Sequence, residues 1–115
     1  MIRNLTRQTV VARTAWEARS FCWRGRGMIA RRFDGFDALI FPGAGTIHMC
    51  FIGQALDVIF LDRDRRVRKL VPGLKPWRLA GQWGAVTVIE LPVGAIAAAQ
   101  LELGDQLELQ PGRRV

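Results

Sequence analysis

Residues 46–62 read TIHMCFIGQALDVIFLD and contain the two strongest β-strand patterns of the chain, at 46–52 and 55–61. Both segments are rich in β-branched and aromatic side chains, which favour strands. Only a Gly-Gln pair at 53–54 separates them. Because glycine in the first central position is typical of a two-residue type II′ turn, we predict that the two segments form a β-hairpin.

The hairpin register decides which side chains share a face of the sheet. With a turn at 53–54, Cys50 lies opposite Asp57 and His48 lies opposite Ile59. Alternation then places His48, Cys50 and Asp57 on one face and the apolar side chains on the other. An imidazole, a thiol and a carboxylate within cross-strand reach form a candidate site. Its three readings are a mutually satisfied polar pair, a metal site and an activated Cys-His pair.

Asp57 interrupts an otherwise apolar strand, so its carboxylate needs a partner if it is buried. We expect an arginine from the region of Gly25 and Arg26, or Arg31, to supply an ion pair. A structural ion pair and a catalytic acid are both open at this point. The chain has one histidine and no closely spaced cysteine pair, so we predict neither a bound metal nor a cofactor.

The candidate binding pocket lies around this hairpin. Its predicted residues are Arg24, His48, Cys50, Asp57 and Trp77. We predict that Cys22 and Cys50 are buried thiols and do not form a disulfide.

The remaining sequence is dominated by short strand patterns. Pro92 followed by an alanine-rich run predicts one helix at 93–101, and 27–32 has the length for one or two further helical turns. The stretch at 72–76, PGLKP, predicts irregular structure. The fold class that we predict is mainly β: a single-domain jelly-roll-like sandwich or distorted barrel with one or two short helices.

Length and composition limit the classes of protein. The chain has 115 residues, half of them apolar, which is enough for one domain with its own core. We treat 1–115 as one β domain whose segments 1–8 and 111–115 are peripheral. Its uninterrupted apolar runs are too short to cross a membrane, and the N-terminus lacks the apolar core of a secretory signal. We expect a cytoplasmic protein as the sequence is written, or a secreted or periplasmic one if a signal has been removed.

Positive charge is concentrated in two blocks. Residues 1–32 hold eight arginines and one glutamate, and residues 63–78 hold seven bases and one aspartate, in a chain with a net charge of +7. Together with four tryptophans, these bases match the mixture that binds single-stranded nucleic acid. The glycine pairs lack the continuation of a phosphate-binding loop.

Five short motifs resemble, in order and spacing, those of the prokaryotic domain-of-unknown-function family 192, also known as uncharacterised protein family 0127. They cover residues 20–109 and read GRGMIAR at 25–31, IHM at 47–49, LDVIFLD at 56–62, VIELPVG at 88–94 and LGDQL at 103–107. The resemblance implies a mainly β, jelly-roll-like fold and no established activity. At 49–57 the chain reads MCFIGQALD where the family has M-K-N-T-x-x-P-L-D, so a family lysine and asparagine are replaced here.

Three hypotheses for function follow. The first is a non-enzymatic module that binds a small ligand or a protein partner in the predicted pocket. The second is a basic module that binds nucleic acid or anionic surfaces through the blocks 1–32 and 63–78. The third is an enzyme that uses His48, Cys50 or Asp57.

Overall fold

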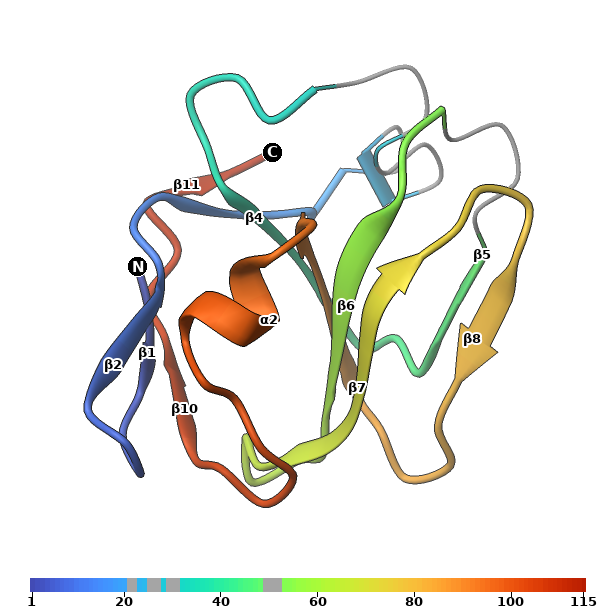
Figure 1. Ribbon diagram of the computed structural model, residues 1–115. Coiled ribbons are helices and arrows are strands. Elements are labelled where there is room, and N and C mark those ends of the chain that lie inside the picture. Colours follow the sequence, from blue (N-terminus) through green and yellow to red (C-terminus); the bar gives the residue numbers. More distant parts are fainter. Residues whose placement is uncertain (21–22, 25–27, 29–31, 49–52) are drawn as a thin grey trace.

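Three open β-sheets organise the residues described by the computed structural model, namely 1–20, 23–24, 28, 32–48 and 53–115 (Figure 1). The elements are β1 (Ile2–Asn4), β2 (Thr9–Ala12), β3 (Ala15–Glu17), β4 (Ala38–Pro42), β5 (Thr46–His48), β6 (Leu56–Leu61), β7 (Val67–Leu74), β8 (Leu79–Gly81), β9 (Thr87–Pro92), the helix α2 (Ala95–Ala98), β10 (Leu107–Leu109) and β11 (Arg113–Arg114). The predicted mainly β single domain is confirmed. Because its sheets are open, the architecture is a layered sandwich and not a closed barrel.

The central sheet has six strands in the order β11-β3-β4-β9-β6-β7. All six residues of β6 are buried, and so are the first five of β9. Strands that are apolar on both faces are stable only in the middle of a covered sheet, which explains why β4, β9 and β6 occupy the centre. The shorter and more polar β11 and the arginine-bearing β7 take the two edges.

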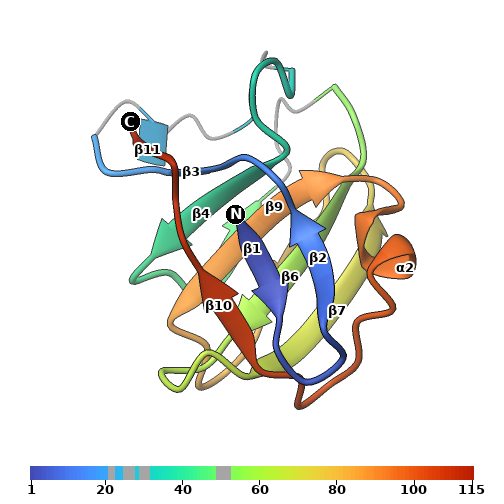
Figure 2. The same cartoon turned by 90° about the vertical axis from the view of Figure 1, so that its left-hand side faces the viewer.

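Each face of the central sheet has its own cover. The β10-β1-β2 sheet and α2 lie over one face (Figure 2). Its core contains Ile40, Ile59, Ile89 and Leu91, among others. We call the other side the aromatic face. There, Leu39, Phe41, Val58 and Phe60 pack against Met28, Phe36, Trp16 and Trp23, and against side chains of the two-stranded β5-β8 sheet.

The predicted hairpin between 46–52 and 55–61 is wrong. β6 has β7 on one side and β9 on the other, so that Ile59 lies opposite Leu70 and Ile89. β5 pairs instead with β8, and His48 lies opposite Leu79. Gly53 lacks the positive φ of a type II′ turn. The apolar strand β6 gains more burial between two long strands than it would beside the short β5, and this outweighs the local turn preference. Residues 49–52 lie outside the described part of the chain.

The structure differs from two further expectations about secondary structure. Residues 72–74, predicted to be irregular, continue β7, because an edge strand tolerates a proline whose missing N–H would face outward. The helix predicted at 93–101 is shorter: α2 covers Ala95–Ala98, and Gln100 leaves the helical region with a φ of 54°. Most of the predicted helical turns at 27–32 lie outside the described residues.

Both ends of the chain take part in β-sheets. β1 is the middle strand of its sheet, and its Ile2 is fully buried. At the other end, β11 pairs with β3 in parallel. Within the described residues, the structure has no helix of the length and apolarity that crossing a membrane requires.

Candidate functional site

The structure describes four of the five predicted pocket residues and places them on different elements. Asp57 lies on the central sheet, whereas His48 ends β5 in the two-stranded sheet. Trp77 stands two residues before β8 and is 63% exposed. Arg24 is exposed, and its Nη1 donates a hydrogen bond to the carbonyl oxygen of Pro42 at 2.7 Å. Cys50, like Cys22, lies outside the described residues.

Asp57 is a structural residue at the side of the sheet that faces α2. It is 1% exposed. Its Oδ1 accepts a hydrogen bond from the Gly73 N–H at 2.8 Å, and its Oδ2 accepts from the N–H groups of Gly94 at 3.1 Å and Ile96 at 2.9 Å. The partner that the sequence demanded therefore exists, but it is three backbone amides. The arginines expected in this role, Arg26 and Arg31, lie outside the described residues.

The hydrogen bonds that Asp57 accepts at the start of α2 have a clear local cause. The first N–H groups of a helix have no partner within the helix, and a carboxylate satisfies them well. Asp57 thereby fixes the start of α2 and the bend of β7 at Gly73 to the middle of the sheet. His48 and Asp57 lie in different sheets, so the hairpin register that would place them on one face does not exist. No cluster of three or more metal-ligating side chains occurs among the described residues.

A surface hollow lies beside β5 and β8, where glycines bring two loops together. Its volume is about 590 Å³, and it is lined by Gly45, Thr46 and the run Gly81, Gln82, Trp83, Gly84 and Ala85. The Gln82 N–H donates to the Gly45 carbonyl at 3.1 Å. A Cβ at Gly45 would come within 2.8 Å of the Ala85 oxygen, so the two loops can approach this closely only because residue 45 is a glycine.

The wall of the hollow carries one large exposed aromatic side chain and lies close to two cations. Trp83 is 93% exposed. The guanidinium of Arg68 lies so close to Gly84 that a Cβ there would be 3.2 Å from its Cζ. Lys69 Nζ donates to the Gly81 carbonyl at 3.0 Å. Among the described residues, neither cation is part of an ion pair.

Glu90 is a second buried acid, on the aromatic face of the central sheet. It is 3% exposed, and its Oε2 has no hydrogen-bond partner among the described residues. Burial raises the pKa of Glu90 to about 8. Sequence reasoning missed it. The signal that identified Asp57, a carboxylate inside an apolar strand, is equally present in the run Thr87–Leu91.

A profile of the family described as DUF192, Uncharacterized ACR, matches residues 3–109. The chain belongs to the DUF192 family. A UPF0127 protein of Thermococcus sibiricus is 38% identical over 104 residues, which cover 75% of this chain and 67% of the relative. Another, from Pyrococcus abyssi, is 37% identical over 109 residues, covering 80% and 92%.

Two solved structures are similar to this DUF192 chain. One is a protein of unknown function from Novosphingobium aromaticivorans, with a TM-score of 0.70 and 27% identity over 83% of this chain and 74% of the other. The second is a putative transcription regulator from Sinorhizobium meliloti, with a TM-score of 0.68 and 20% identity, covering 81% and 78%. The second likeness concerns the fold. The family is uncharacterised, so function has to be argued from the site.

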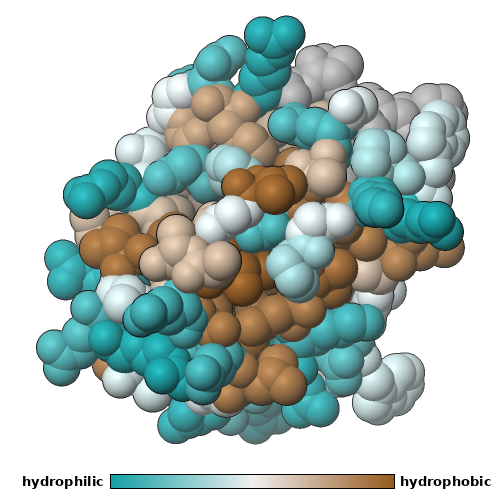
Figure 3. Space-filling view, in the orientation of Figure 1, coloured by the Kyte–Doolittle hydropathy of each residue, from teal (hydrophilic) through white to brown (hydrophobic). Residues whose placement is uncertain are grey.

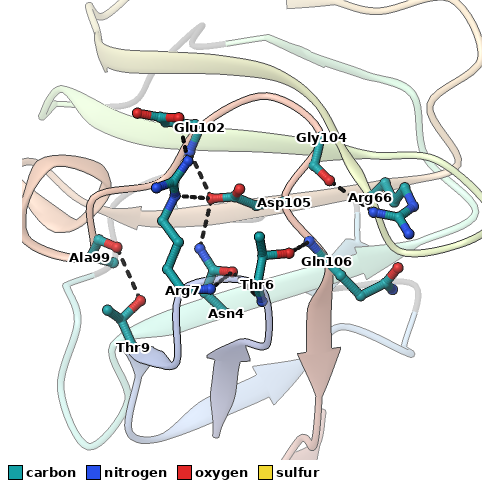
Figure 4. A network of polar contacts seen from close by, with 10 residues as sticks. All are labelled: Asn4, Thr6, Arg7, Thr9, Arg66, Ala99, Glu102, Gly104, Asp105 and Gln106. Atoms are coloured by element: carbon teal, nitrogen blue, oxygen red, sulfur yellow. Dashed lines mark hydrogen bonds and ion pairs between the residues drawn. The ribbon is translucent and has the colours of Figure 1, made fainter.

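The motif at 103–107 that resembles the family's closing box has a structural role in this DUF192 chain (Figure 4). Asp105 Oδ2 accepts hydrogen bonds from Asn4 Nδ2 at 2.7 Å and from the Glu102 N–H at 2.9 Å. Arg7 Nε lies 3.0 Å from the same oxygen, and Arg7 also pairs with Glu102. Burial by itself raises the pKa of Asp105, but the Glu102 amide, Asn4 and Arg7 together outweigh it, and the net pKa is lowered. This network ties β1 to the loop after α2.

Proposed function

We propose that this DUF192 protein is a non-enzymatic binding module that takes a small planar anion in the hollow beside β5 and β8. The observation that carries the proposal is Trp83, an indole that is 93% exposed on the wall of a hollow of about 590 Å³. Exposing a tryptophan to water has no structural benefit, and tryptophan is the residue type that most often anchors a bound partner.

The size of the hollow fits a small molecule. Ligand sites in proteins range from about 300 to 1,000 Å³. The hollow offers Thr46 and Gln82 as hydrogen-bonding side chains between its glycines. A flat aromatic group of the ligand would stack on Trp83, with the polar side chains fixing its orientation.

The charge of the ligand follows from the cations beside the hollow. The guanidinium of Arg68 lies beside Gly84 and the ammonium of Lys69 donates to the Gly81 carbonyl. No carboxylate among the described residues neutralises either of them by an ion pair. A carboxylate, sulfonate or phosphate on the ligand would pair with the guanidinium of Arg68. The aliphatic neighbour Leu79, which is 76% exposed, cannot stack on a base, and this favours a small ligand over an oligonucleotide.

The test uses 8-anilinonaphthalene-1-sulfonate, a planar aromatic anion whose fluorescence rises when it binds. We expect saturable binding by the full chain, weakened about tenfold in Trp83→Ala through the loss of stacking and about fivefold in Arg68→Gln through the loss of the ion pair. Arg63→Gln removes the same charge from the exposed turn after β6, and Leu103→Ala removes an apolar side chain that is 65% exposed elsewhere. Both controls should bind as the parent protein does.

Equal binding by the parent protein and Trp83→Ala would overturn the proposal. A labelled single-stranded oligonucleotide, titrated at two salt concentrations, tests the nucleic-acid alternative. Strongly salt-dependent oligonucleotide binding that Trp83→Ala leaves unchanged, without dye binding at the hollow, would replace the small anion by a nucleic acid on the basic blocks.

A further inference from the structure

β8 and the turns on either side of it carry a large share of the exposed apolar side chains. Large apolar side chains are exposed at eight positions among the described residues, and four of these lie within residues 77–86. They are Trp77, Leu79, Trp83 and Val86. In Figure 1, β8 and the turn before it lie on the right-hand side of the molecule, and Figure 3 shows hydrophobic and hydrophilic side chains next to each other on that side. Apolar side chains gathered on a surface mark a place where a partner binds.

The turn between β7 and β8 presents its tryptophan in an unfavourable backbone conformation. The Arg78 N–H donates a hydrogen bond to the Lys75 carbonyl at 3.3 Å, and Pro76 and Trp77 are the two central residues. Trp77 has a φ of 67°. Proline followed by a positive φ is the pattern of a type II turn, whose third position favours glycine and disfavours a bulky side chain. The fold therefore keeps a tryptophan where glycine would be more stable, and holds its side chain 63% exposed.

The charges around this tryptophan are all positive. Lys75 and Arg78 lie on either side of the central turn residues, and both are exposed. Among the described residues, neither of them takes part in an ion pair. Residues 65–89 contain six bases and no acid. A partner that covers this turn has to be negatively charged as well as apolar.

We infer that Lys75, Trp77, Arg78 and Leu79 form a docking surface for an anionic lipid membrane, which we call the turn surface. The indole and the leucine side chain enter the boundary between the headgroups and the acyl chains, and the two cations pair with lipid phosphates. Tryptophan is enriched at this boundary because one end of its ring system is apolar and the other is polar. Basic residues beside it are attracted by the negative potential of anionic lipids.

The leucine of the turn surface favours a membrane over a nucleic acid. Leu79 is 76% exposed, and an aliphatic side chain can neither stack on a base nor pair with a phosphate. A lipid surface buries Leu79 and neutralises Arg78 at the same time. A turn on the outside of the molecule also meets a flat surface without any change of the fold. The inference does not rest on the anion hollow, whose Trp83 lies beyond the other end of β8.

The first test sediments the full chain with vesicles of phosphatidylcholine and phosphatidylglycerol, mixed at about 3:1, and with vesicles of phosphatidylcholine alone. We expect the anionic vesicles to bind at least about tenfold more tightly, and the binding to weaken as NaCl is raised from about 0.05 to about 0.3 M. Arg78→Gln should lower the affinity about fivefold. Arg63→Gln removes the same charge from the exposed turn after β6 and should change the affinity less than about twofold.

The second test uses Trp77→Gly, because glycine suits the positive φ of this position. The variant should unfold in urea at a midpoint equal to or above that of the parent protein, and yet bind anionic vesicles about tenfold more weakly. Vesicles that contain lipids brominated in their acyl chains should quench the tryptophan fluorescence of the parent protein more than that of the variant. Leu103→Ala, at a residue 65% exposed elsewhere, and Trp83→Ala, at the hollow, should both keep vesicle binding.

Equal vesicle binding by Trp77→Gly and the parent protein would overturn the inference. So would the absence of binding to anionic vesicles, or equal binding to neutral ones. Binding of a labelled oligonucleotide that Trp77→Gly weakens, without binding of vesicles, would assign the turn surface to a nucleic acid instead. Because the hollow is tested by dye binding in Trp83→Ala, failure of one proposal leaves the other in place.

Discussion

Glu90→Gln should stabilise the protein by an amount that depends strongly on pH. Burial raises the pKa of Glu90 from 4.5 to about 8. Between these two values the folded protein keeps the proton and the unfolded chain has lost it, so the free energy of unfolding falls as pH rises. The contribution of protonated Glu90 to the free energy of unfolding is fully present below pH 4.5 and has been lost by about pH 8. A difference of about 3.5 pKa units corresponds to roughly 5 kcal/mol.

Glutamine has the same shape and cannot ionise, so the variant lacks this loss. The difference between the free energies of unfolding of Glu90→Gln and the parent should therefore grow by about 5 kcal/mol from pH 4.5 to pH 8, and stay constant above it. Urea unfolding followed by tryptophan fluorescence at half-unit steps of pH measures both curves. The titration of Asp105 and the other acids cancels in the difference. Two parallel curves, separated by a constant amount within about 0.5 kcal/mol, would refute the reasoning.

Three further perturbations test the structural residues. Asp57→Ala should cost about 3–4 kcal/mol in urea unfolding, because three backbone amides lose their acceptor; a cost below 1 kcal/mol would show that water replaces the carboxylate. Gly45→Ala should cost about 1–3 kcal/mol, since the new Cβ meets the Ala85 oxygen at 2.8 Å, while Gly53→Ala, with no atom within 4 Å, should be near neutral. Asp105→Asn should cost about 1–3 kcal/mol at pH 7, and the cost should vanish in acid below the lowered pKa of Asp105, because a carboxylate held by donors adds stability only where it is ionised.

Local patterns were sufficient for the strands and insufficient for their pairing. The β-branched and aromatic run at 55–61 correctly predicts β6, and the mainly β class follows from short strand patterns of this kind. The turn preference of Gly53 and Gln54 is a local signal worth about 1 kcal/mol or less, whereas the neighbours of β6 are chosen by the burial of a whole strand. The hairpin therefore failed even though one of its two strands is correct.

The candidate site shows the same limit. The rule that a buried carboxylate needs a partner predicts that Asp57 is satisfied, but its partners, the amides of Gly73, Gly94 and Ile96, come from segments that only the fold brings together. Of the five predicted pocket residues, His48 and Trp77 lie at the same small sheet and its flank. The hollow beside them was not predictable, because it is formed by backbone at glycines and by one tryptophan with no distinguishing sequence pattern.

Asp57 and Glu90 differ in whether the fold supplies hydrogen-bond donors to a buried carboxyl group. They lie on neighbouring central strands, since Asp57 is opposite Leu91 and Glu90 is opposite Val58. Both are almost fully buried, and they point to opposite faces. Asp57 receives three N–H donors, whereas Oε2 of Glu90 receives none among the described residues.

The amides opposite Glu90 in the sheet are already engaged in strand pairing, so the fold offers that carboxyl nothing equivalent to the start of α2. Removing the charge should therefore have opposite signs at the two positions: at pH 8, Asp57→Asn destabilises the protein and Glu90→Gln stabilises it. If both substitutions destabilise it equally at that pH, Glu90 has a partner within the fold and the reasoning is wrong.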